Sequence, residues 1–389
     1  MISLSKSSFT ETLFFILALT FIASPVLAIP PDPDNAALLY YQGFLTLAQL
    51  SDEARDRISH VATGETAPDD QVREDISKCV GAIEFAEAAV EVPGCHWGVR
   101  YSQGFEALMP QLARMRFLAF VLIADARIHA ADGNYRAALE RCLMAGTFAR
   151  HVGDDTLISY LVSIAVRDLE YKCMRDIMGR AASDAELLRW LKNELAASGP
   201  VVVSPVRPMK IEIEIVNNLM QMENIEKLAR VLADSDEKKV AQIVEGADEK
   251  SLERARRIYS ERMNSALTVL STPMPYEQAH SRLKRLADFD QDDPVAMAAK
   301  FFTPALDKVL SQRTGIETHA NAIKTAIDVL LIHAGTGRLP DALPSGLPQD
   351  VFSGKDFEYE KTKEGFILRC RAKSLVADKI QEYEFKIKQ

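Results

Sequence analysis

Residues 117–151 decide the fold class, and they read FLAFVLIADARIHAADGNYRAALERCLMAGTFARH. Apolar residues recur with the period of a helix on both sides of Asp132-Gly133-Asn134, which is a turn sequence. The pattern predicts two helices, Leu108 to Ala131 and Tyr135 to His151, joined as an antiparallel hairpin. We therefore expect a chain built mainly from packed helices.

Within this hairpin, residues 122–145 resemble a single tetratricopeptide-type repeat. The resemblance rests on small or apolar residues at the spacings that let two antiparallel helices approach closely, namely Leu122, Ala126, Gly133, Tyr135, Ala138 and Ala145. His129 and Cys142 stand where larger aromatic residues are usual, and no second copy is in good register. The alternative interpretation is an ordinary helical hairpin.

The composition supports a chain with a large core and mostly helical structure. Hydrophobic residues make up 48% of the 389 residues and charged residues 26%, whereas aromatic residues reach only 7%. The 46 Lys and Arg residues against 55 Asp and Glu residues give a net charge of −9. An acidic chain lacks the clustered cations that bind nucleic acid, so we expect no nucleic-acid partner.

Residues 1–28 have the pattern of a secretory signal peptide. A polar start carrying Lys6 precedes the apolar run Leu13 to Ala23, and Val26 and Ala28 supply the small residues of a cleavage site. The alternative is that the segment is retained as an anchor. With cleavage, we expect an exported chain in the periplasm or at the cell surface, without a stable membrane span.

The mature chain divides by pattern into four parts. Helical periodicity fills 29–198, a Pro-rich connector follows at 199–209, and helices resume over 210–334. After Gly335 the pattern alternates apolar with polar residues, which is typical of a small antiparallel sheet over 335–389. The predicted fold class is mainly α, a helical hairpin array that is tetratricopeptide-like in part, with a small C-terminal β cap.

The first helix of the mature chain begins after a proline-rich lead-in. Asp34 or Asn35 is the predicted N-cap. We expect the helix to bury one broad apolar face formed by Leu38, Leu39, Tyr41, Leu45 and Ala48.

The five cysteines are Cys79, Cys95, Cys142, Cys173 and Cys370. In an oxidising compartment pairs are allowed, and the odd number leaves at least one unpaired. We predict a disulfide between Cys79 and Cys95, because a helix followed by the turn at 92–94 can bring those ends together. The alternative is that all five are buried, inert side chains.

A candidate binding surface follows the same cysteine. Trp97, Tyr101 and Phe105 lie four residues apart, the spacing of one face at a helix start, with His96 beside them. The simpler interpretation of this face is core packing. If the face is exposed and concave, it is the place for a ligand or a peptide.

Catalytic and metal-binding motifs are largely missing from the sequence. HExxH, GxSxG, the P-loop and a complete GxGxxG are all absent, and no cofactor is predicted. Cys95 with His96 is a possible nucleophilic pair, but adjacent residues seldom have the geometry this needs. His151 with Asp154 and Asp155 has a spacing compatible with a metal site, although a helix end followed by an Asp cap explains it better.

Two stretches resemble known proteins. Asn35-Ala36-Ala37-Leu38-Leu39-Tyr40-Tyr41 and Cys95-His96-Trp97-Gly98, with the helix that follows, resemble a family of exported, uncharacterised helical bacterial proteins. That resemblance implies a helical fold over about 35–180 and no activity. Residues from about 320 to 370, through the motifs at 337–343, 348–359 and 364–368, resemble the globular end of type II secretion pseudopilins, which implies a helix, a turn, a loop and a β-hairpin. Val351 replaces the usual Pro, and the acidic calcium loop is absent.

These patterns favour a non-enzymatic interaction or scaffold protein of the cell envelope, whose partner is another envelope protein. The alternative is an all-α envelope hydrolase or lyase, with its site between helices near His96, His129 and His151. The sequence contains nothing that fixes the oligomeric state.

Overall fold

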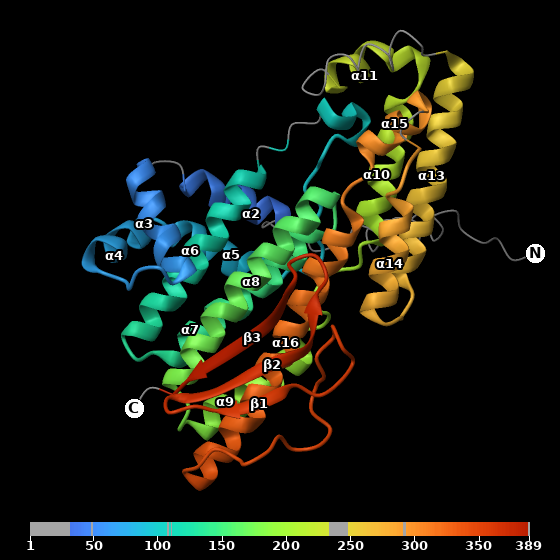
Figure 1. Ribbon diagram of the computed structural model, residues 1–389. Coiled ribbons are helices and arrows are strands. Elements are labelled where there is room, and N and C mark those ends of the chain that lie inside the picture. Colours follow the sequence, from blue (N-terminus) through green and yellow to red (C-terminus); the bar gives the residue numbers. More distant parts are fainter. Residues whose placement is uncertain are drawn as a thin grey trace, which may run out of the picture. The chain divides into compact units, whose positions relative to one another are not determined.

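The predicted hairpin is present as α6 (Gln111–Ala131) and α7 (Tyr135–Gly153). The turn between them depends on Gly133, whose φ of +79° lies in the left-handed region that favours glycine. The next helix, α8 (Leu157–Arg180), runs back along α7 in the same core, as Figure 1 shows. The single hairpin is thus confirmed, whereas its membership of a repeat array stays a prediction.

The computed structural model describes residues 32–47, 50–106, 109, 111–232, 248–290 and 293–387. The predicted signal peptide, 1–28, lies outside the described residues. The chain divides into two units, Met1–Asp34 and Asn35–Gln389. All the described helices and strands belong to the second unit.

The N-terminal helices form a layer beside α6. α2 (Ala36–Thr46) and α5 (Val80–Val90) pack together, while α3 (Asp52–Thr63) and α4 (Asp70–Ser77) connect them and pack on α6. Asn35 is the N-cap of α2, as predicted, because its side chain accepts a hydrogen bond from the Ala37 amide.

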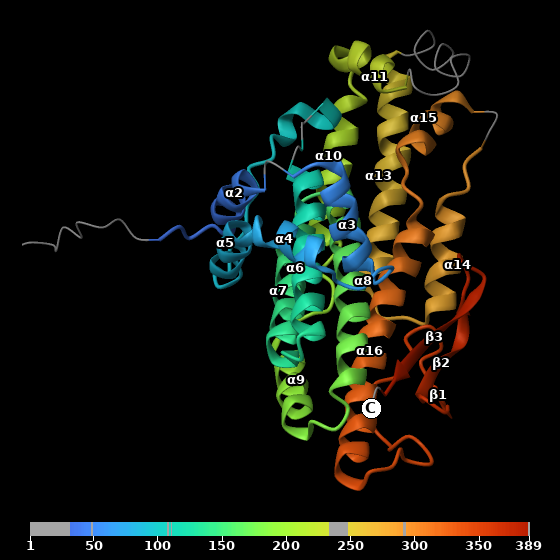
Figure 2. The same cartoon turned by 90° about the vertical axis from the view of Figure 1, so that its left-hand side faces the viewer.

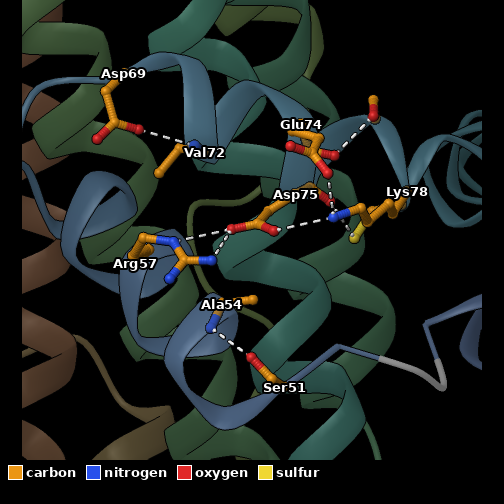
Figure 3. Close-up of polar contacts among 10 residues, drawn as sticks. Ser51, Ala54, Arg57, Asp69, Val72, Glu74, Asp75 and Lys78 are labelled. Carbon is orange, nitrogen blue, oxygen red and sulfur yellow. Dashed lines mark hydrogen bonds and ion pairs between the residues drawn. The ribbon is translucent and has the colours of Figure 1, made fainter.

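A buried carboxylate holds α3 and α4 together (Figure 3). Asp75 of α4 is buried, and one of its oxygens accepts hydrogen bonds from Arg57 of α3 at 3.0 and 2.7 Å. Its other oxygen is 3.5 Å from the Lys78 ammonium. A buried charge needs this pairing, so the contacts fix the relative position of the two helices.

The connector is shorter than the sequence indicates. After α9 (Ala185–Ala197), the chain is irregular only as far as Pro205, and α10 (Val206–Leu219) begins four residues before the predicted Lys210. Pro208 lies in the first turn of α10, where the amide has no partner within the helix, so a proline is tolerated.

The C-terminal helices form a second group. Its members are η2 (Met222–Asn224), α11 (Ile225–Leu232), α13 (Glu249–Ser271), α14 (Tyr276–Leu286), α15 (Pro294–Phe302) and α16 (Leu306–Thr336). α16 is the long element that joins the groups, since it packs against α8, α9 and α14 (Figure 2).

The predicted β cap is a three-stranded antiparallel sheet in the order β1-β2-β3, formed by β1 (Glu358–Lys361), β2 (Gly365–Ser374) and β3 (Lys379–Lys386). β3 packs on α8 and α16. At the contact with α8, a side chain on Gly179 would collide with the main-chain oxygen of Lys386. The sheet therefore lies as close to α8 as a glycine allows.

The mainly α fold with a small β cap is confirmed. The regions that the sequence separates at 199–209 and at Gly335 lie in one unit, where α8 contacts both α16 and β3. Among the described helices, none combines the length and the apolarity needed to cross a bilayer.

Candidate functional site

The loop after α5 is held against the start of α2. The side chain of Asn35 donates to the His96 carbonyl over 3.0 Å and accepts from the His96 amide over 2.8 Å. The Ala36 amide also donates to the Gly94 carbonyl over 2.8 Å. The two N-terminal stretches that carry the family resemblance therefore contact each other directly.

Trp97 belongs to the core and not to a binding surface. Only 3% of its surface is exposed, and its ring stacks on Tyr40 with centroids 5.4 Å apart. The indole N–H donates to the His151 carbonyl over 2.8 Å, and the Tyr40 hydroxyl is 2.9 Å from Nδ1 of His151. The core-packing interpretation is right for Trp97.

Trp97, Tyr101 and Phe105 do not share one helical face, contrary to the prediction. Gly98, with φ of +67°, lies in an irregular stretch between Trp97 and the short helix η1 (Tyr101–Glu106). Trp97 therefore does not belong to the helix that contains Tyr101. His96 is exposed and Tyr101 is half-buried, and the side chain of Phe105 lies outside the described residues. The predicted surface of His96, Trp97, Tyr101 and Phe105 is therefore not one exposed face.

Three elements meet at a buried acid. The Tyr101 hydroxyl of η1 donates to Oδ1 of Asp155 over 2.6 Å, and the guanidinium of Arg207 in α10 lies 3.7 Å from the same oxygen. Asp155 is 5% exposed, and its other oxygen has no hydrogen-bond partner. Arg207 is also 3.9 Å from Asp154. The network joins η1, the α7–α8 junction and α10.

The protonation states of Cys95 and His151, near this network, do not favour nucleophilic catalysis. Burial, followed by the nearby Asp155, raises the pKa of Cys95 to about 12, so its thiol is protonated at neutral pH. Burial also lowers the pKa of His151 to about 4, with Arg150 adding to the effect, so its ring is neutral. A protonated thiol and a neutral, hydrogen-bonded imidazole are structural groups here.

The metal-site alternative finds no support in the described part of the chain. There, no group of three or more His, Cys, Asp or Glu side chains could hold a metal ion. α7 ends at Gly153, and Thr156, not an Asp as predicted, caps α8 in a capping box with Ser159. Hydroxyl caps account for the helix start that the sequence assigned to an Asp.

The three histidines of the enzyme alternative do not form one site. His129 is near the end of α6, 3.6 Å from Asp125, whereas His151 is near the far end of α7 and contacts Tyr40. Because α7 rises about 1.5 Å per residue, His151 lies roughly 24 Å along α7 from Tyr135, at the hairpin turn near which His129 lies. His129 and His151 therefore lie too far apart to act in one site.

The predicted disulfide does not form. Cys79 and Cys95 are free thiols. Cys79 precedes α5 and lies beside the end of α2, because Gly81 contacts Thr46 there. Cys95 follows α5 and lies beside the start of α2. The 11 residues of α5 span about 16 Å, beyond the reach of a disulfide.

Of the five α2 residues predicted to be buried, three lie on its outer face, Leu39 is half-buried against the core, and Ala48 lies outside the described residues. Leu38, Tyr41 and Leu45 are exposed by 50%, 36% and 74%, and we call them the α2 stripe. The buried face instead carries Ala36, Ala37, Tyr40 and Phe44. Both faces of this helix are apolar, so the period of the pattern alone did not tell which one is buried.

A groove of about 700 Å³ also lies between α14, α16 and the loop before β1. Asp350 in its wall is fully buried, and its carboxylate accepts from the Phe352 amide, the Ser353 hydroxyl and the Arg371 amide. Those bonds shape the loop and leave this carboxylate engaged.

Comparison of the chain with protein-family models, curated proteins and solved structures finds no match. The helix, loop and antiparallel strands after residue 306 have the order that the pseudopilin resemblance implies. Both resemblances nevertheless stay predictions.

Proposed function

We propose that the chain is an exported, non-enzymatic interaction or scaffold protein of the cell envelope, which binds another envelope protein through the α2 stripe. The observation that carries the proposal is the exposure of Leu38, Tyr41 and Leu45 on a helix whose other face is fixed in the core. Exposed apolar side chains at helical spacing are the anchors by which a helix binds a partner.

The α2 stripe is rigid, which favours binding. Tyr41 donates its hydroxyl to the Trp97 carbonyl over 2.8 Å, and Tyr40 and Phe44, on the inner face, lie against the Trp97 ring. A surface that is already ordered loses little conformational entropy when a partner binds.

The charges near the stripe indicate the chemistry of the partner. α2 contains no charged residue, whereas α5, which packs beside it, carries the exposed Glu84 and is followed by the exposed Glu91 at its C-cap. A partner segment with an apolar stripe flanked by Lys or Arg would complement both features. We therefore expect binding to weaken as salt screens the acidic border.

A matched set of baits tests the proposal. Residues 29–389 are used against envelope extract in three forms: unchanged, L38Q/L45Q, and I158Q. Ile158 is 54% exposed on α8, so I158Q removes a similar apolar surface elsewhere. The proposal predicts one saturable protein retained by the unchanged chain and by I158Q, and lost with L38Q/L45Q. Equal retention by all three baits would contradict it.

Export has a separate test. Intact-mass measurement of the chain recovered from the envelope should give a start at Ile29, after cleavage of residues 1–28. A chain that starts at Met1 would contradict the signal-peptide assignment, while the binding test above would still apply.

A further inference from the structure

Side chains of α8 lie directly against two glycines of α7. A side chain on Gly153 would collide with Ser163, and one on Gly146 would collide with Glu170 and the guanidinium of Arg167. The two helices are antiparallel neighbours in the sequence and in Figure 1. Gly153 thus faces Ser163, and Gly146, seven residues earlier in α7, faces Glu170, seven residues later in α8. This pairing defines the register of the two helices.

The same register brings two cysteines together. Four residues beyond Gly146 along α7 is Cys142, and three residues beyond Glu170 along α8 is Cys173. Both are fully buried and both are free. Burial raises the pKa of Cys142, and the Cys173 thiol raises it further by hydrogen bonding and charge, so the two side chains interact.

We propose that Cys142 and Cys173 are a disulfide site, linked when the chain folds in contact with a disulfide oxidant such as oxidised glutathione. The two thiols lose two protons and two electrons and form one S–S bond, while the oxidant's S–S bond is reduced to two thiols. The inference does not depend on partner binding through the α2 stripe. In an exported chain, the compartment would supply the oxidant.

The packing explains why this pair suits a disulfide. A disulfide requires Cα atoms within about 7 Å and Cβ atoms that point towards each other. Gly146 lies one turn from Cys142, and there the side chains of Arg167 and Glu170 from α8 lie directly against α7. Cys79 and Cys95 lie at opposite ends of α5, so they cannot form a disulfide with each other.

Burial also decides when the bond forms. The reactive species in disulfide exchange is the thiolate, and both thiols are closed to solvent in the folded chain. We therefore expect the link to form before α7 and α8 have packed, and to form slowly once they have.

Thiol counting on the full-length chain tests the proposal. The reduced, unfolded chain is refolded with oxidised and reduced glutathione, then alkylated in denaturant and weighed. Five cysteines less one linked pair leave three alkylated thiols. Tryptic digestion without reductant should yield peptide 142–150 joined to peptide 173–175, because trypsin cleaves after Arg141, Arg150, Lys172 and Arg175.

Single variants provide the controls. C142S should leave four alkylated thiols and no linked peptide, whereas C79S should keep the link and leave two. Five alkylated thiols in the unchanged chain, or a link that contains Cys79, Cys95 or Cys370, would overturn the proposal. The peptide map of the unchanged chain decides this even if a variant does not fold.

Thermal unfolding gives a second readout. The linked chain should unfold at a higher temperature than the same chain after reduction, because the link closes a loop of about 30 residues in the unfolded chain. Equal unfolding temperatures would contradict a link that fits the native α7–α8 packing.

Discussion

Tyr41 donates its hydroxyl to the main-chain oxygen of Trp97 over 2.8 Å while more than a third of its own surface stays exposed. The bond ties an outer residue of α2 to a loop whose indole ring is buried in the core. Exposure of the α2 stripe is therefore a property of a fixed helix, and Leu38 and Leu45 lie on that same fixed face.

The contact between Gly179 and Lys386 predicts a strong effect of a single methyl group. G179A should destabilise the chain by about 1–3 kcal/mol, because the obstacle is the main chain of β3, which cannot rotate away. The measurement is chemical denaturation followed by circular dichroism.

The matched control is G315A, in the middle of α16. Nothing lies near the position that its new side chain would take, so the change should stabilise the helix by up to about 1 kcal/mol. Equal effects of G179A and G315A would show that β3 does not lie against α8 in this way.

The buried Asp75 predicts a second stability effect. D75N should cost about 1–3 kcal/mol, because the replacement leaves the Arg57 guanidinium without its charged partner. About a third of the Arg57 side chain is exposed to solvent, so we expect a smaller loss of stability than for a fully buried ion pair.

D132N is the matched control for D75N. Asp132 pairs with Arg73 at 2.7 Å, but the Asp132 side chain is 42% exposed, whereas that of Asp75 is 5% exposed. We expect almost no change in the free energy of unfolding, since exposed ion pairs contribute little. A similar loss in both variants would contradict the role of burial.

His151 predicts a loss of stability in acid. Its pKa is about 4 in the folded chain and about 6.5 when unfolded, so between these values the unfolded chain binds more protons. The contribution is complete above pH 6.5 and is lost as the pH falls towards 4. Allowing for solvent screening, the loss is about 2 kcal/mol.

The variant H151Q removes this titration. Denaturation at pH 7 and at pH 4.5 should show a smaller decrease in stability for H151Q than for the unchanged chain. Parallel decreases in the two chains would contradict the burial of a neutral imidazole.

The sequence predicts the fold where local signals are strong. Gly133 marks the hairpin turn, Asn35 caps α2, and alternation after Gly335 predicts the sheet, all of which the structure confirms. These features depend on residues near one another in the chain, so their physics is visible in the pattern.

Packing between elements that are distant in the sequence could not be predicted in the same way. Both faces of α2 are apolar, and only the packing of Tyr40 and Phe44 on Trp97 shows which is buried. Likewise, Cys142 and Cys173 lie 31 residues apart, and the register that makes them neighbours depends on the α7–α8 contact at Gly146.

The central claim is that the α2 stripe binds a partner, and the dissociation constant of the captured protein tests it most directly. We predict that L38Q/L45Q weakens binding by about ten- to a hundredfold relative to the unchanged chain, while I158Q leaves it unaltered. Helicity should be the same in all three chains, because the substituted residues are exposed. Equal dissociation constants for the unchanged chain and L38Q/L45Q would contradict the account.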